Sequence, residues 1–106
     1  MSAETATATR PEVCEVALDG ELTVYQAAAL KETILSSLTR GGAIRVDLSG
    51  VTAIDGAGIQ LLLLWQSLAG ARGLDLGLVV CSQVVVEMLE LLRLSARFPI
   101  AGRVPV

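Results

Sequence analysis

The stretch Val46-Asp-Leu-Ser-Gly-Val-Thr-Ala-Ile-Asp-Gly-Ala-Gly58 decides the fold of this chain. Residues 44–48 alternate apolar and polar side chains, which is the period-two pattern of a strand with one buried face. From residue 59 to residue 68 the apolar side chains are too dense for alternation and too many for one strand, so a helix is predicted. Asp55 is the expected N-cap of that helix, and the two glycines that follow it would let another part of the backbone approach closely.

The chain before this stretch predicts a hairpin and then a helix. Residues 13–18 alternate as a strand, Asp19-Gly20 is typical of a hairpin turn, and Glu21-Leu22 would start a short return strand. Thr23 has the place of a helix N-cap, with a glutamine three residues later as a capping box requires. The apolar residues that follow recur at spacings of three and four, and this helix is expected to end at Gly41-Gly42.

The chain after the stretch predicts one more strand and helix. The strand covers residues 74–81, Ser82 is the N-cap of a helix that runs to Leu92, and residues 98–100 form either a last edge strand or a packed tail. The element order is therefore β-β-α-β-α-β-α, with or without a final β. Strands that alternate with helices pair in parallel, and the first hairpin would supply a mixed edge. We expect a small α/β sandwich with a four- to five-stranded mixed sheet packed against three or more helices.

Composition excludes several classes of protein. The 106 residues suffice for one domain, and the net charge of -3 comes without the Lys and Arg clusters of a nucleic-acid-binding surface. No apolar run approaches the roughly 18 to 20 residues of a membrane span, and the first ten residues lack the apolar segment of a signal peptide. Residues 1–11 are predicted to be a disordered tail, residues 12–106 the domain, and the location cytoplasmic.

The sequence offers no set of catalytic or metal-binding side chains. It has no histidine, and Cys14 and Cys81 lie inside strand patterns as small buried hydrophobes, so neither a metal site nor a cofactor is expected. The loop from Asp55 to Gly58 lacks the lysine and the glycine spacing of a phosphate-binding loop. A receiver domain is excluded because Asp19 stands alone and Lys31 is the one lysine. We expect a protein that is not an enzyme.

The helix after Asp55 has more apolar surface than packing on a sheet requires. Gln60 and Ser67 mark one narrow polar face, and the rest of the circumference is largely apolar. Either the excess forms a partner interface, or the helix is buried between two neighbours nearly all round. The sequence leaves both alternatives open.

These motifs resemble the STAS domain, the fold of bacterial anti-sigma factor antagonists. Residues 46–58 look like the family's central motif, in which an Asp is followed by Ser or Thr, a small residue and Gly. Residues 20–30 are similar to the family's turn into its first helix, and residues 78–89 to its third strand and helix. Among members, the stand-alone STAS proteins of bacterial chemotaxis gene clusters are the most similar in their helix starts.

The resemblance implies a module for protein–protein interaction in bacterial signalling or transcription regulation. In the family a kinase-like anti-sigma factor, or a related protein with the histidine-kinase fold, phosphorylates the hydroxyl residue after the Asp. Here that phospho-acceptor position is Gly56, which has no hydroxyl, and Ser49 and Thr52 are the nearest alternative acceptors. The implied partner-binding residues are Thr23, Asp55, Gly56, Ala57, Gly58, Gln60 and Leu63.

Other roles remain open for a STAS domain with this sequence. One is the small STAS subunit of an ABC-type lipid transport complex, where the same surface would hold an ATPase. Another is a module that binds a small ligand. A homodimer is a third alternative, with the apolar surface of the helix after Asp55 as its interface.

Overall fold

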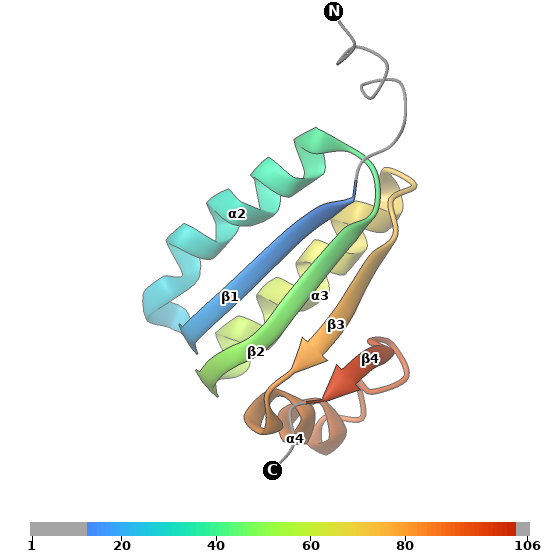
Figure 1. Cartoon of the computed structure of the whole chain (residues 1–106). Helices are drawn as coiled ribbons and strands as arrows, with labels where there is room; N and C mark the ends of the chain where they lie inside the picture. Colours follow the sequence, from blue (N-terminus) through green and yellow to red (C-terminus); the bar gives the residue numbers. More distant parts are fainter. Residues whose placement is uncertain (1–12, 104–106) are drawn as a thin grey trace, which may run out of the picture.

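The computed structural model describes residues 13–103, and the side chains of residues 13–100. Figure 1 shows one sheet with helices connecting its successive strands. In chain order the elements are β1 (Cys14–Leu22), the 3-10 turn η1 (Val24–Gln26), α2 (Ala27–Arg40), β2 (Ile44–Ile54), α3 (Gly56–Ala71), β3 (Leu76–Cys81), α4 (Gln83–Leu91) and β4 (Ile100–Arg103). The predicted tail over residues 1–11 lies outside the described residues.

The described strands form a four-stranded sheet in the order β1-β2-β3-β4. Each neighbouring pair is parallel. The small α/β architecture agrees with the prediction. The mixed edge was wrong, because the segment predicted as a hairpin is a single strand.

β1 continues through Asp19-Gly20 and stays paired with β2 as far as Leu22, which lies opposite Ile54. The pairing shifts register on both sides of this dipeptide, and Gly20 has a φ of 76°. A glycine with positive φ serves a β-bulge as well as a hairpin turn, and here it forms the bulge. Opposite the bulge, a Cβ on Gly50 would lie 2.8 Å from the Cβ of Asp19, so the two strands approach closely where they bend.

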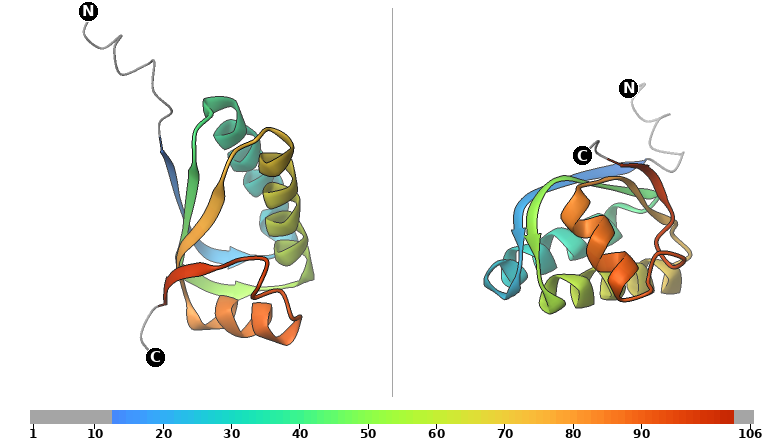
Figure 2. Two further views of the ribbon diagram at one scale, coloured as in Figure 1. Left: turned by 90° about the vertical axis from the view of Figure 1, so that its right-hand side faces the viewer. Right: turned by 90° about the horizontal axis from the view of Figure 1, so that it is seen from below.

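The bend in β1 and β2 divides the helices into two groups. Figure 2 shows α2 and α3 together on one face of the sheet, with the last parts of β1 and β2 turning beneath them. α4 packs against the other side of these turned ends and contacts β2. As a result, the carboxyl ends of β1 and β2 meet the starts of η1 and α3 in one place.

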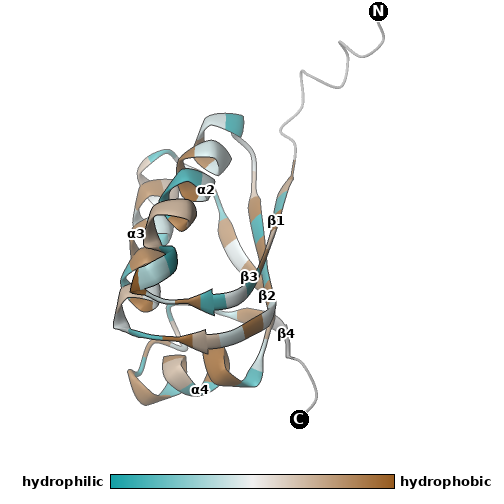
Figure 3. Ribbon diagram, turned by 90° about the vertical axis from the view of Figure 1, so that its left-hand side faces the viewer, coloured by the Kyte–Doolittle hydropathy of each residue, from teal (hydrophilic) through white to brown (hydrophobic). Residues whose placement is uncertain are grey.

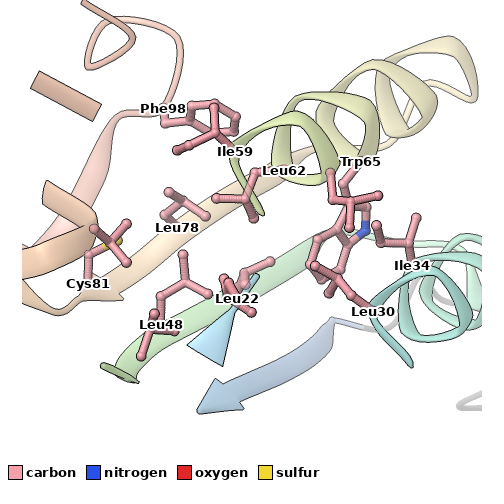
Figure 4. Packing of buried hydrophobic residues seen from close by; sticks show 14 of the residues in the cluster. Leu22, Leu30, Ile34, Leu48, Ile59, Leu62, Trp65, Leu78, Cys81 and Phe98 are labelled. Atoms are coloured by element: carbon pink, nitrogen blue, oxygen red, sulfur yellow. The ribbon is translucent and has the colours of Figure 1, made fainter. Parts of the chain in front are cut away.

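Mostly aliphatic side chains, together with Trp65 and Phe98, fill the space between the sheet and the helices (Figure 4). The side chain of Trp65 is fully buried, and its indole Nε1 donates a hydrogen bond to Ser37 Oγ at 2.9 Å. Ser37 Oγ in turn donates to the carbonyl oxygen of Ile34 at 2.7 Å. This chain of bonds satisfies the polar groups buried between α2 and α3. Cys14 and Cys81 are both buried, as predicted.

The remaining differences from the prediction concern the ends of elements. β3 begins at Leu76, α4 ends at Leu91, and Ser82 caps α4 without a side-chain hydrogen bond. Phe98 is buried in the core, and the last strand starts after Pro99 and pairs with β3. Within residues 13–103, no helix has the length and apolarity that crossing a membrane would demand.

Candidate functional site

The carboxylate of Asp55 caps two helical segments at once. Its Oδ1 accepts a hydrogen bond from Gly58 N at 3.0 Å, inside the first turn of α3. Its Oδ2 accepts from Val24 N at 3.1 Å, at the start of η1. The backbone N–H of Asp55 also donates to the carbonyl oxygen of Leu22 at 3.2 Å. One residue therefore fixes the end of β1, the start of η1 and the start of α3 relative to one another.

The capping box predicted at Thr23 does not form. Thr23 is the N-cap of η1, but its side chain makes no capping bond, and its Oγ1 is buried without a hydrogen-bond partner among the described residues. α2 begins only at Ala27. The N–H of Gln26, which a capping Thr23 side chain would accept, instead donates to the backbone carbonyl oxygen of Thr23 at 2.9 Å, and the N–H of Val24 donates to Asp55.

The same bonds hold Asp55 in its charged form. The N–H of Gly58, and after it those of Val24 and Ala57, keep the pKa of the Asp55 carboxyl below its ordinary value of 3.8. A negative charge at a helix N-terminus is favourable because the first N–H groups of the helix point toward it. Asp55 is thus ionised at neutral pH and stabilises the junction.

The two glycines after Asp55 have different roles. A Cβ on Gly58 would lie 2.2 Å from the carbonyl oxygen of Leu22, so α3 can approach the end of β1 only with glycine at this position. A Cβ on Gly56 would have no neighbour within 4 Å. The close approach predicted for this glycine pair is confirmed at Gly58, whereas Gly56 faces open space.

The predicted partner-binding residues divide by exposure. Gly56 and Gln60 are exposed, Gly58 is buried, and the other four (Thr23, Asp55, Ala57 and Leu63) are half-buried. Gly58 is therefore a structural residue at this junction.

The exposed residues of η1 beside this junction were not predicted as site residues. The side chain of Val24 is 58% exposed and that of Tyr25 is 87% exposed, next to the bond between Val24 and Asp55. The sequence did hold a signal for Tyr25. This aromatic side chain is out of phase with the apolar stripe of the following helix, and so points outward.

α3 is buried around most of its circumference. Leu61, Leu62, Trp65 and Ala69 are buried, and the outer face of α3 carries Gln60 and Ser67 with Leu64 between them, 43% exposed. Figure 3 shows α3 lying beside α2 on the sheet, with apolar residues along much of its length. Most of the circumference of α3 is therefore covered by its neighbours, and Leu64 stays exposed on the outer face.

The alternative acceptor residues lie at the bend of β2. Ser49 and Thr52 are both exposed, and Ser49 N donates to Asp47 Oδ1 at 2.8 Å in a local turn. The hydroxyl and N–H of Ser49 lower the pKa of Asp47. In the part of the chain that is described, no group of His, Cys, Asp or Glu is arranged to hold a metal ion.

A family model described as "Mlab, STAS domain" matches residues 5–100. The chain belongs to the STAS domain family. STAS domains are in general modules for protein interaction rather than enzymes. A search of curated proteins finds no match to this chain.

Among solved structures, the domain is similar to one described as a sulfate transporter family protein from Wolinella succinogenes. The TM-score is 0.68 with 18% sequence identity, over 85% of this chain and 77% of the other. At that identity the similarity shows a shared STAS fold.

Proposed function

We propose that this STAS domain is an interaction module of the anti-sigma factor antagonist type that binds a signalling protein with the histidine-kinase fold. The observation that carries the proposal is the double cap by Asp55. It holds η1 and the start of α3 together, and the exposed residues there include Val24, Tyr25, Gly56 and Gln60. We call these four residues the cap surface.

The cap surface has the chemistry of a protein contact. Tyr25 is a large side chain with an apolar ring and a polar tip, the type that contributes most binding energy at interfaces. Gly56 adds no side chain, so a partner could approach the start of α3 closely. Because Asp55 orders both segments before binding, little conformational entropy remains to be lost on association.

Gly56 makes the proposed interaction constitutive. A phosphate at this position would place about -1.5 to -2 of charge on the surface that the partner must approach. With no hydroxyl at Gly56, that route to release is missing. The domain therefore keeps the surface that binds the partner and lacks the phosphorylation switch that would release it. A role in a chemotaxis gene cluster, in transcription regulation and in the cytoplasm belongs to the same proposal.

The missing hydroxyl also favours a second candidate, the small STAS subunit of an ABC-type transport complex for lipids. A subunit that stays assembled with its ATPase needs no phosphorylation switch, and the cap surface would serve as its contact. The similar solved structure is itself a sulfate transporter family protein, which is compatible with a transporter-associated use of the fold.

Site-specific photo-crosslinking in the native cell separates these candidates. A photo-reactive phenylalanine analogue replaces Tyr25 in one variant and Leu91 of α4 in a control, since Leu91 is 76% exposed and lies on another element. We expect a crosslink from position 25 to a protein with a histidine-kinase-type ATP-binding domain. A crosslink to a transporter ATPase would support the second candidate, and crosslinks from position 91 alone would contradict docking at the cap surface.

A further inference from the structure

β1 lies at the edge of the sheet, and a groove runs between it and α2. A hollow of about 400 Å³ is lined by Cys14–Val16 on one side and by Ala29, Thr33 and Ser36 on the other, among others. It continues into a smaller hollow of about 160 Å³ beside the bulged end of β1, and Ala29 and Thr33 line both. Figure 1 shows α2 running alongside the free edge of β1. We call the two hollows together the edge groove.

Within residues 13–103, no strand pairs with the outward-facing backbone groups of β1 beside this groove. Cys14 N donates to Ala43 O at 2.7 Å, so Cys14 faces β2, as does Val16 two residues later. In a parallel pair, alternate residues direct their N–H and C=O groups to opposite sides. Glu15 and Ala17 therefore direct theirs outward, and both residues are exposed.

The walls of the groove leave room for side chains of an added strand. Ala29, Thr33 and Ser36 recur at spacings of four and three, so small residues line part of the side of α2 that faces β1, with Glu32 and Arg40 beside them. An added strand would direct every second side chain toward these residues. The intervening side chains would lie beside Glu15 on the open face of the sheet.

The charge of the groove is acidic. Glu15, Glu32 and Arg40 line the larger hollow, and Asp19 and Glu21 line the smaller one. Four acidic residues and one arginine thus line the two hollows, and Arg45 of β2 lies beside Glu15 on the open face of the sheet. None of these four carboxylates forms an ion pair with another described residue.

From these observations we infer that the edge groove binds an extended peptide segment of a partner protein, added as a strand to the free edge of β1. The segment alternates basic and small apolar residues, with the basic ones beside Glu15 and the apolar ones against α2. Main-chain hydrogen bonds to Glu15 and Ala17 would give affinity, and the alternation would give specificity. This surface lies on the side of α2 that faces β1, and the inference does not rest on the function proposed for the cap surface.

A model peptide tests the inference with the full chain. The probe is a fluorescein-labelled octapeptide of alternating Lys and Val with blocked ends, and its binding is followed by fluorescence polarisation. The control peptide has the same composition as a block of four Lys followed by four Val. Hydrogen exchange of the Glu15 and Ala17 amides is followed in the same samples. We expect saturable binding of the alternating peptide, at least tenfold weaker binding of the block peptide, and slower exchange of both amides.

Two matched variants locate the site. Ala29→Arg fills the edge groove with a positive charge, whereas Ala28→Arg places the same side chain on the neighbouring exposed position of α2, outside both hollows. Arg is a good helix former, so both should fold, which circular dichroism would check. We expect Ala29→Arg to weaken peptide binding at least tenfold and Ala28→Arg less than twofold.

Three results would overturn the inference. Equal binding of the block peptide would show attraction by charge alone. Equal effects of the two Arg variants, or no saturation by the alternating peptide, would exclude the edge groove as the site. Protection of Glu15 and Ala17 that rises with protein concentration in the absence of peptide would show that a second copy of the chain takes the edge.

Discussion

Asp55 accepts a hydrogen bond from the backbone N–H of Val24, which lies 31 residues earlier in the chain. The other oxygen of the same carboxylate accepts the N–H of Gly58. A single side chain thus connects the start of η1 to the start of α3 and holds the cap surface together.

Replacing Asp55 should loosen both connections. Asparagine is a good N-cap but offers one oxygen in place of two, so Asp55→Asn should keep one bond and lose the other. Asp55→Ala should lose both and lower the melting temperature further than Asp55→Asn. Hydrogen exchange at Val24 and Gly58 would show which bond is lost, and unchanged protection of both amides in Asp55→Ala would contradict the double cap.

The stability that Asp55 contributes should depend on pH. Its carboxyl pKa is lowered below 3.8 in the folded state, so its contribution is complete well above that pH and is lost as the pH falls through the folded-state pKa. The stability difference between the wild type and Asp55→Asn should therefore be constant at neutral pH and shrink below pH 3.8. Urea unfolding at several pH values measures this difference. Because Asp47 titrates in both proteins, its effect cancels, and a difference that stays constant into the acid range would contradict the charged cap.

The two glycines of the loop should respond differently to the same substitution. Gly58→Ala forces a Cβ against the carbonyl oxygen of Leu22, and we expect it to destabilise the domain by at least about 2 kcal/mol. Gly56→Ala enters open space at the start of a helix, where alanine is favoured over glycine by up to about 1 kcal/mol. Chemical denaturation compares the two, and similar losses at both positions would refute the close approach at Gly58.

The buried bond between Trp65 and Ser37 should be needed for stability. Ser37→Ala leaves the indole N–H of Trp65 buried without an acceptor, which costs about 1–3 kcal/mol. Ser36→Ala, at the exposed neighbouring position, is the control and should change the free energy of unfolding by less than about 0.5 kcal/mol. Urea unfolding followed by fluorescence would measure both, and equal effects would show that the bond adds nothing.

Phosphorylation should be absent in the wild type and restorable at Gly56. A Cβ fits at this exposed position, so Gly56→Ser should place a hydroxyl there without strain. Incubated with its kinase-like partner and ATP, the wild type should incorporate no phosphate near the loop, and Gly56→Ser should incorporate it if the partner retains kinase activity. Peptide mass spectrometry locates the phosphate, and modification of wild-type Ser49 or Thr52 would show that the switch was moved rather than lost.

Several elements of the fold could be predicted from local patterns in the sequence. The alternation in β2, the cap at Asp55 and the dense apolar face of α3 were predicted correctly because each depends on neighbouring residues. At Asp19-Gly20, a hairpin turn and a bulge use the same glycine conformation. Only pairing with β2, more than 30 residues away, decides between them.

The capping of η1 was mispredicted for a similar reason. Thr23 has the local pattern of a capping box, but the N–H of Gln26 bonds to the backbone carbonyl oxygen of Thr23 in a 3-10 turn, and the N–H of Val24 bonds to Asp55 on another element. Likewise, the need for glycine at position 58 is set by the carbonyl oxygen of Leu22, and no window of sequence around Gly58 contains that contact.

The most direct test of the central claim measures how tightly the partner captured from position 25 binds two variants of α3. Gln60 and Ser67 lie on the same exposed face of the helix, two turns apart, and only Gln60 belongs to the cap surface. With the purified partner in a calorimeter, Gln60→Arg should weaken binding at least tenfold, and Ser67→Arg should change it less than twofold. Equal affinities of both variants and the wild type would contradict docking at the cap surface.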